Sequence, residues 1–147
     1  MYVPPFEALL RSLDTSRDAL DANKKVAIPA ALLKLLIQLA VAHSDFDEER
    51  YLQANPDVRD AVQRGDLDSG HVHYIGYGYF EGRKGGVPKV DERRYLREYP
   101  DVAAAIREGK VKSASDHFHT IGAAEGRSPS ADEAVSAAQW KKALHGK

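Results

Sequence analysis

Apolar residues recur every three or four positions along most of the chain, which is the spacing that places them on one face of an α-helix. From Pro5 to about Asp21 they alternate in this way with charged residues, which predicts a first amphipathic helix. A second helix is predicted from about Ile28, because Pro29 suits a first helical turn. With a polar turn over residues 21–25, the two form a predicted helical hairpin at residues 1–44.

The body of the second predicted helix, residues 30–42, is apolar on nearly every side, and Lys34 and Gln38 share its one polar face. A helix of this kind has to be covered, so we expect it to be buried. The rest of the chain could cover it, or the same helix of a second chain. In such a homodimer the interface would contain four leucines: Leu32, Leu35, Leu36 and Leu39.

The stretch from Asp47 to Arg83 recurs without a gap, 44 positions later, as Asp91 to Arg127, and 16 of the 37 aligned residues are identical. We call these stretches the first copy and the second copy. A fixed period of this length predicts that each copy becomes one structural unit that packs against its neighbour. The identities include Tyr51-Leu52, Pro56-Asp57-Val58, Gly65, Ser69, His73, Gly78 and Glu81-Gly82-Arg83, with their equivalents in the second copy.

Helix start and stop signals divide each copy into three short helices. In the first copy the middle helix is the most readable, because Asn55 can cap it, Pro56 fits its first position and Gly65 ends it. The second copy has Tyr99 in place of Asn55, so its cap must come from elsewhere. The third helix is predicted from Ser69 or Ser113 to the glycine of the Glu-Gly-Arg turn.

The segment after the second copy predicts a closing amphipathic helix over about 130–145, with Ser130 and Glu133 as a capping box. The fold prediction is therefore a compact all-α domain over 1–147 with eight or nine helices, in which Gly85 to Pro88 form a hinge. Its parts are the N-terminal hairpin at 1–44, two tandem 44-residue three-helix repeats at 45–88 and 89–130, and a C-terminal capping helix at 131–147.

The composition excludes some classes of function but does not select a single one. The 21 basic and 22 acidic residues nearly cancel, which gives no general electrostatic reason to bind nucleic acid. There is no cysteine, so disulfides, thiolate zinc sites and cysteine nucleophiles are excluded. The amino terminus does not have the pattern of a secretory signal, and residues 26–42 are too short and too polar for a membrane span. Cytoplasmic residence is the default expectation, and cell-surface association stays open.

Six histidines invite a metal hypothesis, but their spacing argues against it. His71 and His73 are two positions apart, as are His117 and His119, whereas ligand pairs on a helix prefer a separation of three or four. Only His73 and His117 are equivalent between the copies. This equivalence is better explained by a packing contact that each copy makes than by a single active site. We expect no metal, no cofactor and no catalytic residues.

The first copy is richer in aromatic residues than the second, from His73 to Phe80. Aromatic rings with polar tips suit carbohydrate stacking or protein contact, although the same rings could instead pack into the core. In each copy the aspartate of the middle helix and the arginine of the Glu-Gly-Arg turn could also bond to each other. A ligand is expected in the groove between the copies, at His73, Tyr77, Tyr79, Arg83, His117 and Arg127.

The run Tyr-Leu-x-x-Asn-Pro-Asp-Val, followed by His-Tyr or His-Phe and by Gly-x-x-Glu-Gly-Arg, resembles a short helical repeat of bacterial proteins. There it often accompanies glycosyltransferases and other surface-polysaccharide proteins, or large secreted calcium-binding repeat proteins. The resemblance covers Tyr51 to Arg83 and Tyr95 to Arg127, and departs from the pattern at Tyr99, where asparagine is commoner. The residues before 45 are not covered.

That family gives its repeat no catalytic residues, so the resemblance implies a non-catalytic binding or adaptor module connected with bacterial surface polysaccharide. One alternative is a protein-protein interaction scaffold or regulator that dimerises through the apolar helix at 29–42. Another is a small metal-binding protein or enzyme that uses the histidines.

Overall fold

The computed structural model describes residues 2–21, 24–86 and 88–146, and these contain α-helices and π-helical turns but no strand. The all-α prediction is therefore confirmed. The chain divides into two compact units, Met1–His43 and Ser44–Lys147, each of which is described by itself. Whether they form one domain stays a prediction. Three residues of the predicted turn and hinge, Ala22, Asn23 and Val87, lie outside the described residues.

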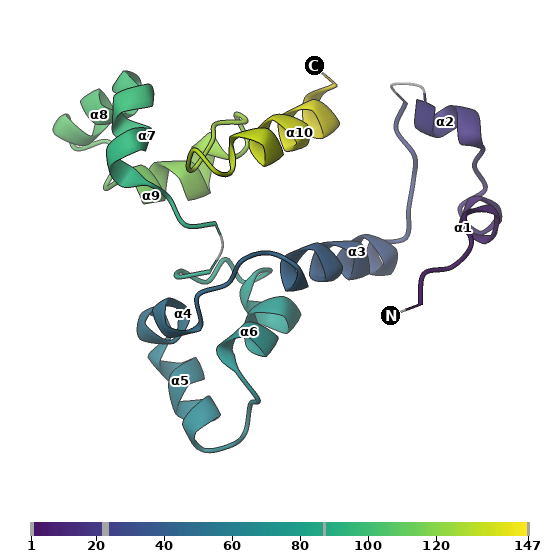
Figure 1. Ribbon diagram of the computed structural model, residues 1–147, viewed down its shortest axis with the longest axis horizontal. Coiled ribbons are helices and arrows are strands. Elements are labelled where there is room, and N and C mark those ends of the chain that lie inside the picture. The colour runs from purple at the N-terminus through teal and green to yellow at the C-terminus, as the bar shows by residue number, and fades with distance from the viewer. Residues whose placement is uncertain (1, 22–23, 87, 147) are drawn as a thin grey trace. The chain divides into compact units, whose positions relative to one another are not determined.

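The first unit contains α1 (Phe6–Ser12), α2 (Arg17–Asp21) and α3 (Ala30–Ala42) (Figure 1). The prediction of one helix from Pro5 to Asp21 is wrong, because the chain turns at Asp14, which has a φ of 48°. The Thr15 N–H donates to the Leu10 carbonyl at 3.1 Å, and the Asp14 N–H to the Arg11 carbonyl at 3.3 Å. These bonds form the Schellman ending that usually needs glycine, and here aspartate takes its place.

Helix α3 begins at Ala30, close to the predicted start at about Ile28, with Pro29 at its N-cap instead of in its first turn. Only Val41 among its residues is buried. Leu33, Leu35 and Leu36 are 48%, 49% and 50% exposed. Within the first unit most of α3 is therefore not covered, and which surface buries it stays a prediction. Of the four predicted interface leucines, Leu35 and Leu36 are exposed, and Leu32 and Leu39 are half-buried.

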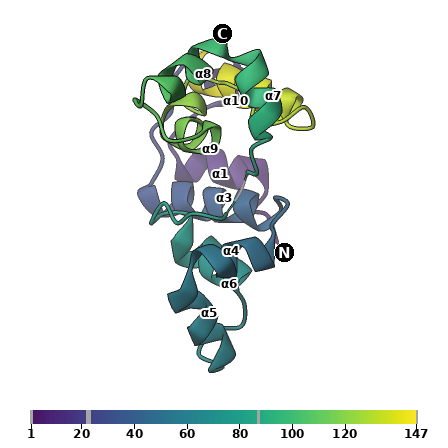
Figure 2. The same cartoon turned by 90° about the vertical axis from the view of Figure 1, so that its left-hand side faces the viewer.

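The second unit begins with two sets of elements whose bounds differ by 44 positions throughout. In both views α4, α5 and α6 lie side by side, and so do α7, α8 and α9 (Figures 1 and 2). The first set is α4 (Glu48–Ala54), α5 (Pro56–Gln63), α6 (Gly70–His73) and the π-helical turn η1 (Tyr74–Gly78). The second set is α7 (Glu92–Glu98), α8 (Pro100–Arg107), α9 (Ala114–His117) and the π-helical turn η2 (Phe118–Gly122).

The helices of the two copies begin where the sequence signals predict, although the predicted cap of Asn55 is not made. The Ser69 hydroxyl accepts from the Val72 N–H at 3.0 Å, and Ser113 makes the equivalent bond to Asp116. Asn55 stands at the N-cap of α5 but makes no side-chain cap, so that part of the prediction is wrong. Its amide nitrogen instead donates to the carbonyls of Tyr51 and Lys84, both at 2.8 Å, which satisfies the end of α4.

The third element of each copy is not the single helix that was predicted. It starts as an α-helix and widens into a π-helical turn, in which the Tyr79 N–H donates to the Tyr74 carbonyl five residues back at 2.9 Å. The Ala123 N–H makes the same bond to Phe118. Turns of this kind are rare and occur frequently at functional sites. They bring the glycines that end η1 and η2 beneath a buried tyrosine.

The chain closes with α10 (Ala134–His145), as predicted, but without the predicted capping box. Glu133 stands at its N-cap with no side-chain bond, and the Ser130 carbonyl accepts from the Ser128 hydroxyl at 2.5 Å. Ser130 thus lies in the turn before the helix. Near the other end of α10, the His145 Nε2–H donates to the Ala124 carbonyl at 2.8 Å, which connects this helix to the second copy.

The break at Asp14 leads to a testable prediction. Because a left-handed φ costs an L-residue free energy that glycine avoids, Asp14→Gly should stabilise the first unit by roughly 0.5–1 kcal/mol. The matched control is Asp18→Gly inside α2, which should be destabilising by a similar amount because glycine weakens a helix interior. Thermal unfolding followed by circular dichroism measures both, and a loss of stability in Asp14→Gly would contradict the turn.

Candidate functional site

A buried tyrosine and a histidine meet at the centre of each copy. The Tyr51 hydroxyl and His73 Nδ1 are hydrogen-bonded at 3.0 Å, and so are Tyr95 and His117. Both tyrosines are 0% exposed. Burial raises the pKa of Tyr51, and likewise that of Tyr95, to about 12. The two histidines that the sequence predicted as ligand contacts therefore make an internal bond, and His117 is buried.

A glycine lies against each tyrosine hydroxyl. A Cβ added at Gly78 would overlap the Tyr51 hydroxyl, and one added at Gly122 would overlap that of Tyr95. The π-helical turn thus ends in the one residue type that leaves room for the hydroxyl. This explains why a glycine stands at this position in both copies.

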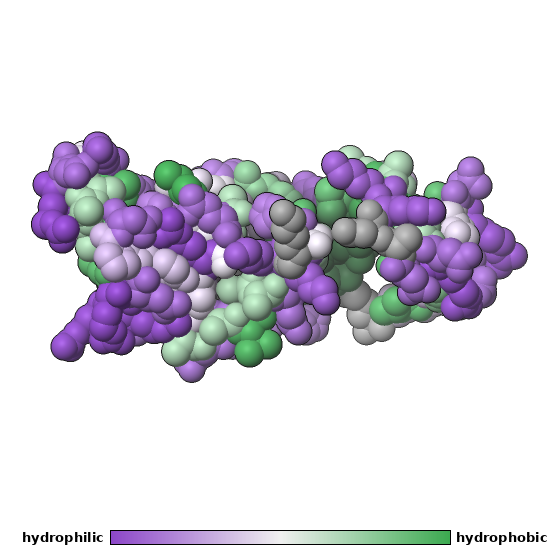
Figure 3. Space-filling model, turned by 90° about the horizontal axis from the view of Figure 1, so that it is seen from above, coloured by the Kyte–Doolittle hydropathy of each residue, from purple (hydrophilic) through white to green (hydrophobic). Residues whose placement is uncertain are grey.

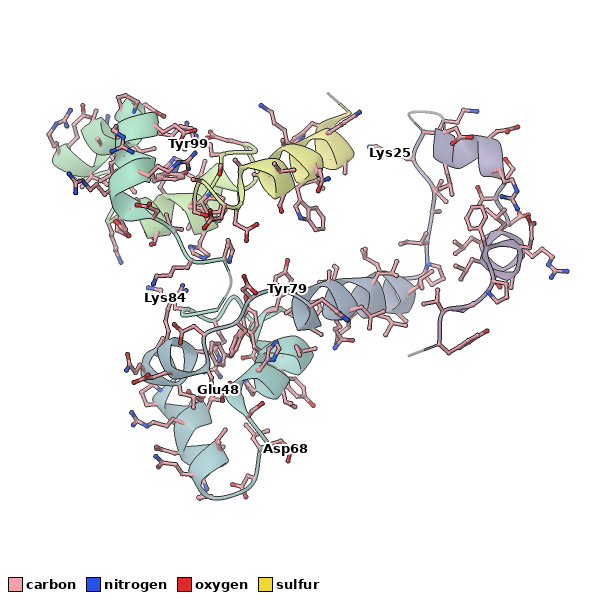
Figure 4. All side chains as sticks on the ribbon, viewed as in Figure 1. Lys25, Glu48, Asp68, Tyr79, Lys84 and Tyr99 are labelled. Atoms are coloured by element: carbon pink, nitrogen blue, oxygen red, sulfur yellow. The ribbon has the colours of Figure 1, made fainter. Side chains whose placement is uncertain are left out.

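A glutamate in the first turn of α4 or α7 joins that helix to the third element of its copy. The Glu48 carboxylate accepts from the N–H groups of Gly70 at 2.5 Å and His71 at 2.9 Å (Figure 4). Glu92 accepts from the N–H of Ser115 at 3.1 Å and from its hydroxyl at 2.7 Å. The first N–H groups of a helix have no intrahelical partner, so these carboxylates satisfy donors that would otherwise be unpaired.

The arginine of each Glu-Gly-Arg turn is held between two carboxylates. Arg83 contacts both oxygens of Asp57, at 2.9 and 2.8 Å, and Glu81 at 2.8 Å. Arg127 contacts Asp101 at 2.9 and 2.7 Å and Glu125 at 2.6 Å. These are the bonds between aspartate and arginine that the sequence suggested.

The same ion pairs shift the pKa of their members. Hydrogen bonds from Arg83 lower the pKa of Asp57, and those from Arg127 lower the pKa of Asp101. Hydrogen bonds raise the pKa of both arginines. For Arg83 the bond to Glu81 is the larger cause and the bond to Asp57 the smaller one, whereas for Arg127 the bond to Asp101 contributes more than the bond to Glu125. Nε and Nη1 of Arg83 and all three nitrogens of the Arg127 guanidinium thus bond within the chain, and a role in ligand binding stays a prediction for both arginines.

Where the copies differ, a different side chain makes an equivalent connection. Asn55 donates to the carbonyl of Lys84, whereas the Tyr99 hydroxyl accepts from the N–H of Ser128 at 3.0 Å. Lys84 and Ser128 are 44 positions apart. The Tyr99 ring also lies 4.9 Å from the Arg127 guanidinium, a favourable cation–π distance. The departure at Tyr99 therefore preserves the connection to the segment that follows the copy (Figure 4).

The remaining predicted contacts, Tyr77 and Tyr79, lie at the surface. Tyr77 is 63% exposed with its ring 5.8 Å from that of His73, and Tyr79 is 43% exposed with its ring in a T-shaped contact with that of Tyr74. The second copy has Ile121 and Ala123 at these positions. Of the six predicted ligand-binding residues, these two alone are exposed, and we call them the aromatic surface of the first copy.

Apolar side chains reach the surface elsewhere too, next to polar ones (Figure 3). Across the described ranges, no group of three or more histidines and acidic residues is arranged to hold a metal ion. In the same part of the chain, no helix has both the length and the apolar character that crossing a membrane requires. Comparisons with protein-family models, with curated proteins and with solved structures find no match to this chain.

Sequence reasoning missed the buried tyrosines and the capping glutamates, although a signal for both was present. Tyr51 and Glu48 are identical in the second copy, as Tyr95 and Glu92. Their partners lie 22 or 23 positions further along the chain, on another helix. Spacing within one helix could not reveal these contacts.

The glycine beneath Tyr51 provides the sharpest test of this geometry. Gly78→Ala should destabilise the protein by about 1–3 kcal/mol, because the new methyl group overlaps the hydroxyl of a packed ring. A Cβ at Gly76, in the same turn, would meet no described atom within 4 Å beyond its chain neighbours and the backbone of its own turn, so Gly76→Ala should be neutral or slightly stabilising. Urea unfolding measures the stability of both variants. Equal losses of stability would contradict the close packing of Gly78 against the Tyr51 hydroxyl.

The ion pairs predict how stability depends on pH. Because the pKa values of Asp57 and Asp101 are lowered by folding, their contribution is present at neutral pH. It is lost as the pH falls below about 4 and these carboxylates are protonated. The double variant Asp57→Asn, Asp101→Asn should therefore lose less stability between pH 5 and pH 2 than the parent chain. The control is Asp132→Asn, at an exposed aspartate outside both ion pairs. It should lose as much stability between pH 5 and pH 2 as the parent chain does.

Proposed function

We propose that this chain is a non-catalytic binding or adaptor module, built on two tandem 44-residue helical repeats. The support for the repeats is that both copies have the same elements at a constant offset and the same tyrosine-histidine and aspartate-arginine contacts. Stacked repeats hold their side chains on a rigid scaffold and present extended surfaces to partners.

The lack of a catalytic role is proposed from how the shared polar residues are used. The histidine, the arginine and the first-turn glutamate of each copy are each bonded to other groups of the same copy. A general acid or base has to reach a substrate proton, whereas these groups hold elements together. Duplication of a structural network explains them without a reaction.

The observation that carries a binding function is the aromatic surface of the first copy. Tyr77 and Tyr79 are exposed on a scaffold that otherwise repeats, and the second copy lacks both rings. Tyrosine offers a large apolar face and a polar hydroxyl, which suits stacking on a sugar ring. The choice of bacterial surface polysaccharide as the ligand rests on the family resemblance, which is an argument by analogy.

The experiment is a calorimetric titration of the protein with surface polysaccharide from its source organism. Tyr77→Ala and Tyr79→Ala should each weaken binding by roughly tenfold or more, as truncation of a binding tyrosine typically does. The matched control is Ile121→Ala, the position of the second copy equivalent to Tyr77, which should bind as the parent does. Unchanged binding in both tyrosine variants would reject this surface.

A second candidate function is protein-protein interaction through α3, which the exposure of Leu33, Leu35 and Leu36 favours. Several exposed leucines on one helix favour an interface. In sedimentation over a concentration series, the parent chain should dimerise and Leu36→Asp should stay a folded monomer. Leu20→Asp, on the exposed surface of α2, is the control and should dimerise like the parent. A parent chain that is monomeric at every concentration would exclude the homodimer.

A further inference from the structure

A cavity of about 290 Å³ lies between the two copies of the repeat. Its lining includes Tyr79, Gly82 and Arg83 from the first copy and Phe118, His119 and Ala123 from the second. Ligand sites in proteins measure roughly 300–1,000 Å³. The volume of this cavity is at the lower end of that range, so it suits one small ligand unit and not a long stretch of polymer.

The equivalent place in the second copy is closed. There the stem of Lys141 lies over Gly126 so closely that a Cβ on this glycine would overlap it, whereas a Cβ on Gly82 would meet no described atom within 4 Å. Arg127 uses all three guanidinium nitrogens in its ion pairs. Arg83 uses Nε and Nη1, and its Nη2 bonds to no described residue. The first copy therefore keeps both open space and a free donor.

The second copy contributes a free acceptor to the same cavity. The carbonyl of Ser115 can only accept, so the Nδ1 of His119, 2.7 Å away, carries the hydrogen of this bond. In the neutral imidazole the other nitrogen, Nε2, is then an acceptor. Among the described residues Nε2 of His119 has no partner, and neither does the hydroxyl of Tyr79, whose ring is 43% exposed. The lining thus combines a donor, an acceptor and an aromatic ring.

The charges around the cavity favour an uncharged ligand. Of the described residues that line it, Arg83 alone carries a charge. Asp57 and Glu81 pair with this arginine, and with the adjacent Lys84 the four charges sum to zero. An anion would therefore gain little net attraction, and a cation would meet no carboxylate in the lining.

We propose that this cavity binds one uncharged sugar ring, an inference that rests on the proposed binding of polysaccharide. The C–H face of such a ring stacks on Tyr79. Its hydroxyl groups both donate and accept, so they can bond to Nε2 of His119 and to Nη2 of Arg83. The proposal deepens the proposed function in two ways, because it adds His119 of the second copy to the site and selects neutral sugars over acidic ones.

The first test is the calorimetric titration with surface polysaccharide, repeated with His119→Ala. This variant should bind roughly fivefold more weakly or less tightly still, as the loss of one hydrogen bond implies. His43→Ala is the matched control, because Nδ1 of His43 makes the same kind of bond to the carbonyl four residues back, at 2.8 Å, and His43 does not line the cavity. It should bind as the parent does.

The second test fills the cavity without touching the histidine. Gly82→Asn adds a side chain to the lining, with a residue that tolerates the left-handed conformation of Gly82, whose φ is 68°. It should weaken binding of the polysaccharide at least tenfold. Gly65→Asn is the matched control, because Gly65 has a φ of 79°, is equally open and does not line the cavity. Its binding should be unchanged.

The third test addresses the class of sugar. The probes are the methyl glycosides of glucose, galactose and mannose and those of the three corresponding uronic acids. Nuclear magnetic resonance follows the ring signals of His119, which are assigned by their loss in His119→Ala. At least one neutral glycoside should shift these signals, and its uronic acid should bind at least threefold more weakly.

The outcomes separate this inference from the function on which it rests. If the parent chain does not bind the polysaccharide, the proposed function fails and the inference fails with it. If the parent binds but His119→Ala and Gly82→Asn bind equally well, the inference alone is overturned. It is also overturned if no neutral glycoside shifts the His119 signals, or if the uronic acids bind as tightly as the neutral sugars.

Discussion

Each copy of this protein depends on a tyrosine hydroxyl that is buried against a glycine and hydrogen-bonded to a histidine. A buried hydroxyl without a partner costs free energy, so the histidine has to stand within reach and the glycine has to leave room. The π-helical turn meets both conditions, because the histidine ends the α-helix before the turn and the glycine ends the turn itself. The position of the third element relative to the first therefore follows from one contact.

Two further connections close each copy around this contact. A glutamate from the first helix satisfies the N–H groups at the start of the third, and an aspartate from the second helix holds the arginine after it. The elements are short, and isolated helices of their length are marginal in water. Their stability comes from these contacts and from the small apolar core, which in the second copy contains Val90, Tyr95, Val102, Ala114 and Phe118.

The sequence alone predicted the helical class and the boundaries of the first two helices in each copy, and it raised the pairing of aspartate with arginine as a possibility. These rest on local signals, such as a proline at a first helical position, or on duplication. It could not predict the π-helical turns, because a tertiary contact, the hydroxyl of Tyr51 or Tyr95 against a glycine, accompanies them. It also missed the break at Asp14, where aspartate adopts a conformation typical of glycine. The positions of His73 and His117 in the sequence could not show that each would hydrogen-bond to a buried tyrosine.

The most direct test of this account is the removal of each buried hydroxyl. Tyr51→Phe and Tyr95→Phe should each lower the free energy of unfolding by about 1–2 kcal/mol, because each leaves a histidine nitrogen without its partner. Tyr77→Phe, at an exposed tyrosine of the same chain, should have almost no effect. Urea unfolding measures all three variants. If Tyr51→Phe and Tyr95→Phe are as stable as Tyr77→Phe, the claim that the tyrosine-histidine bond organises the two copies is contradicted.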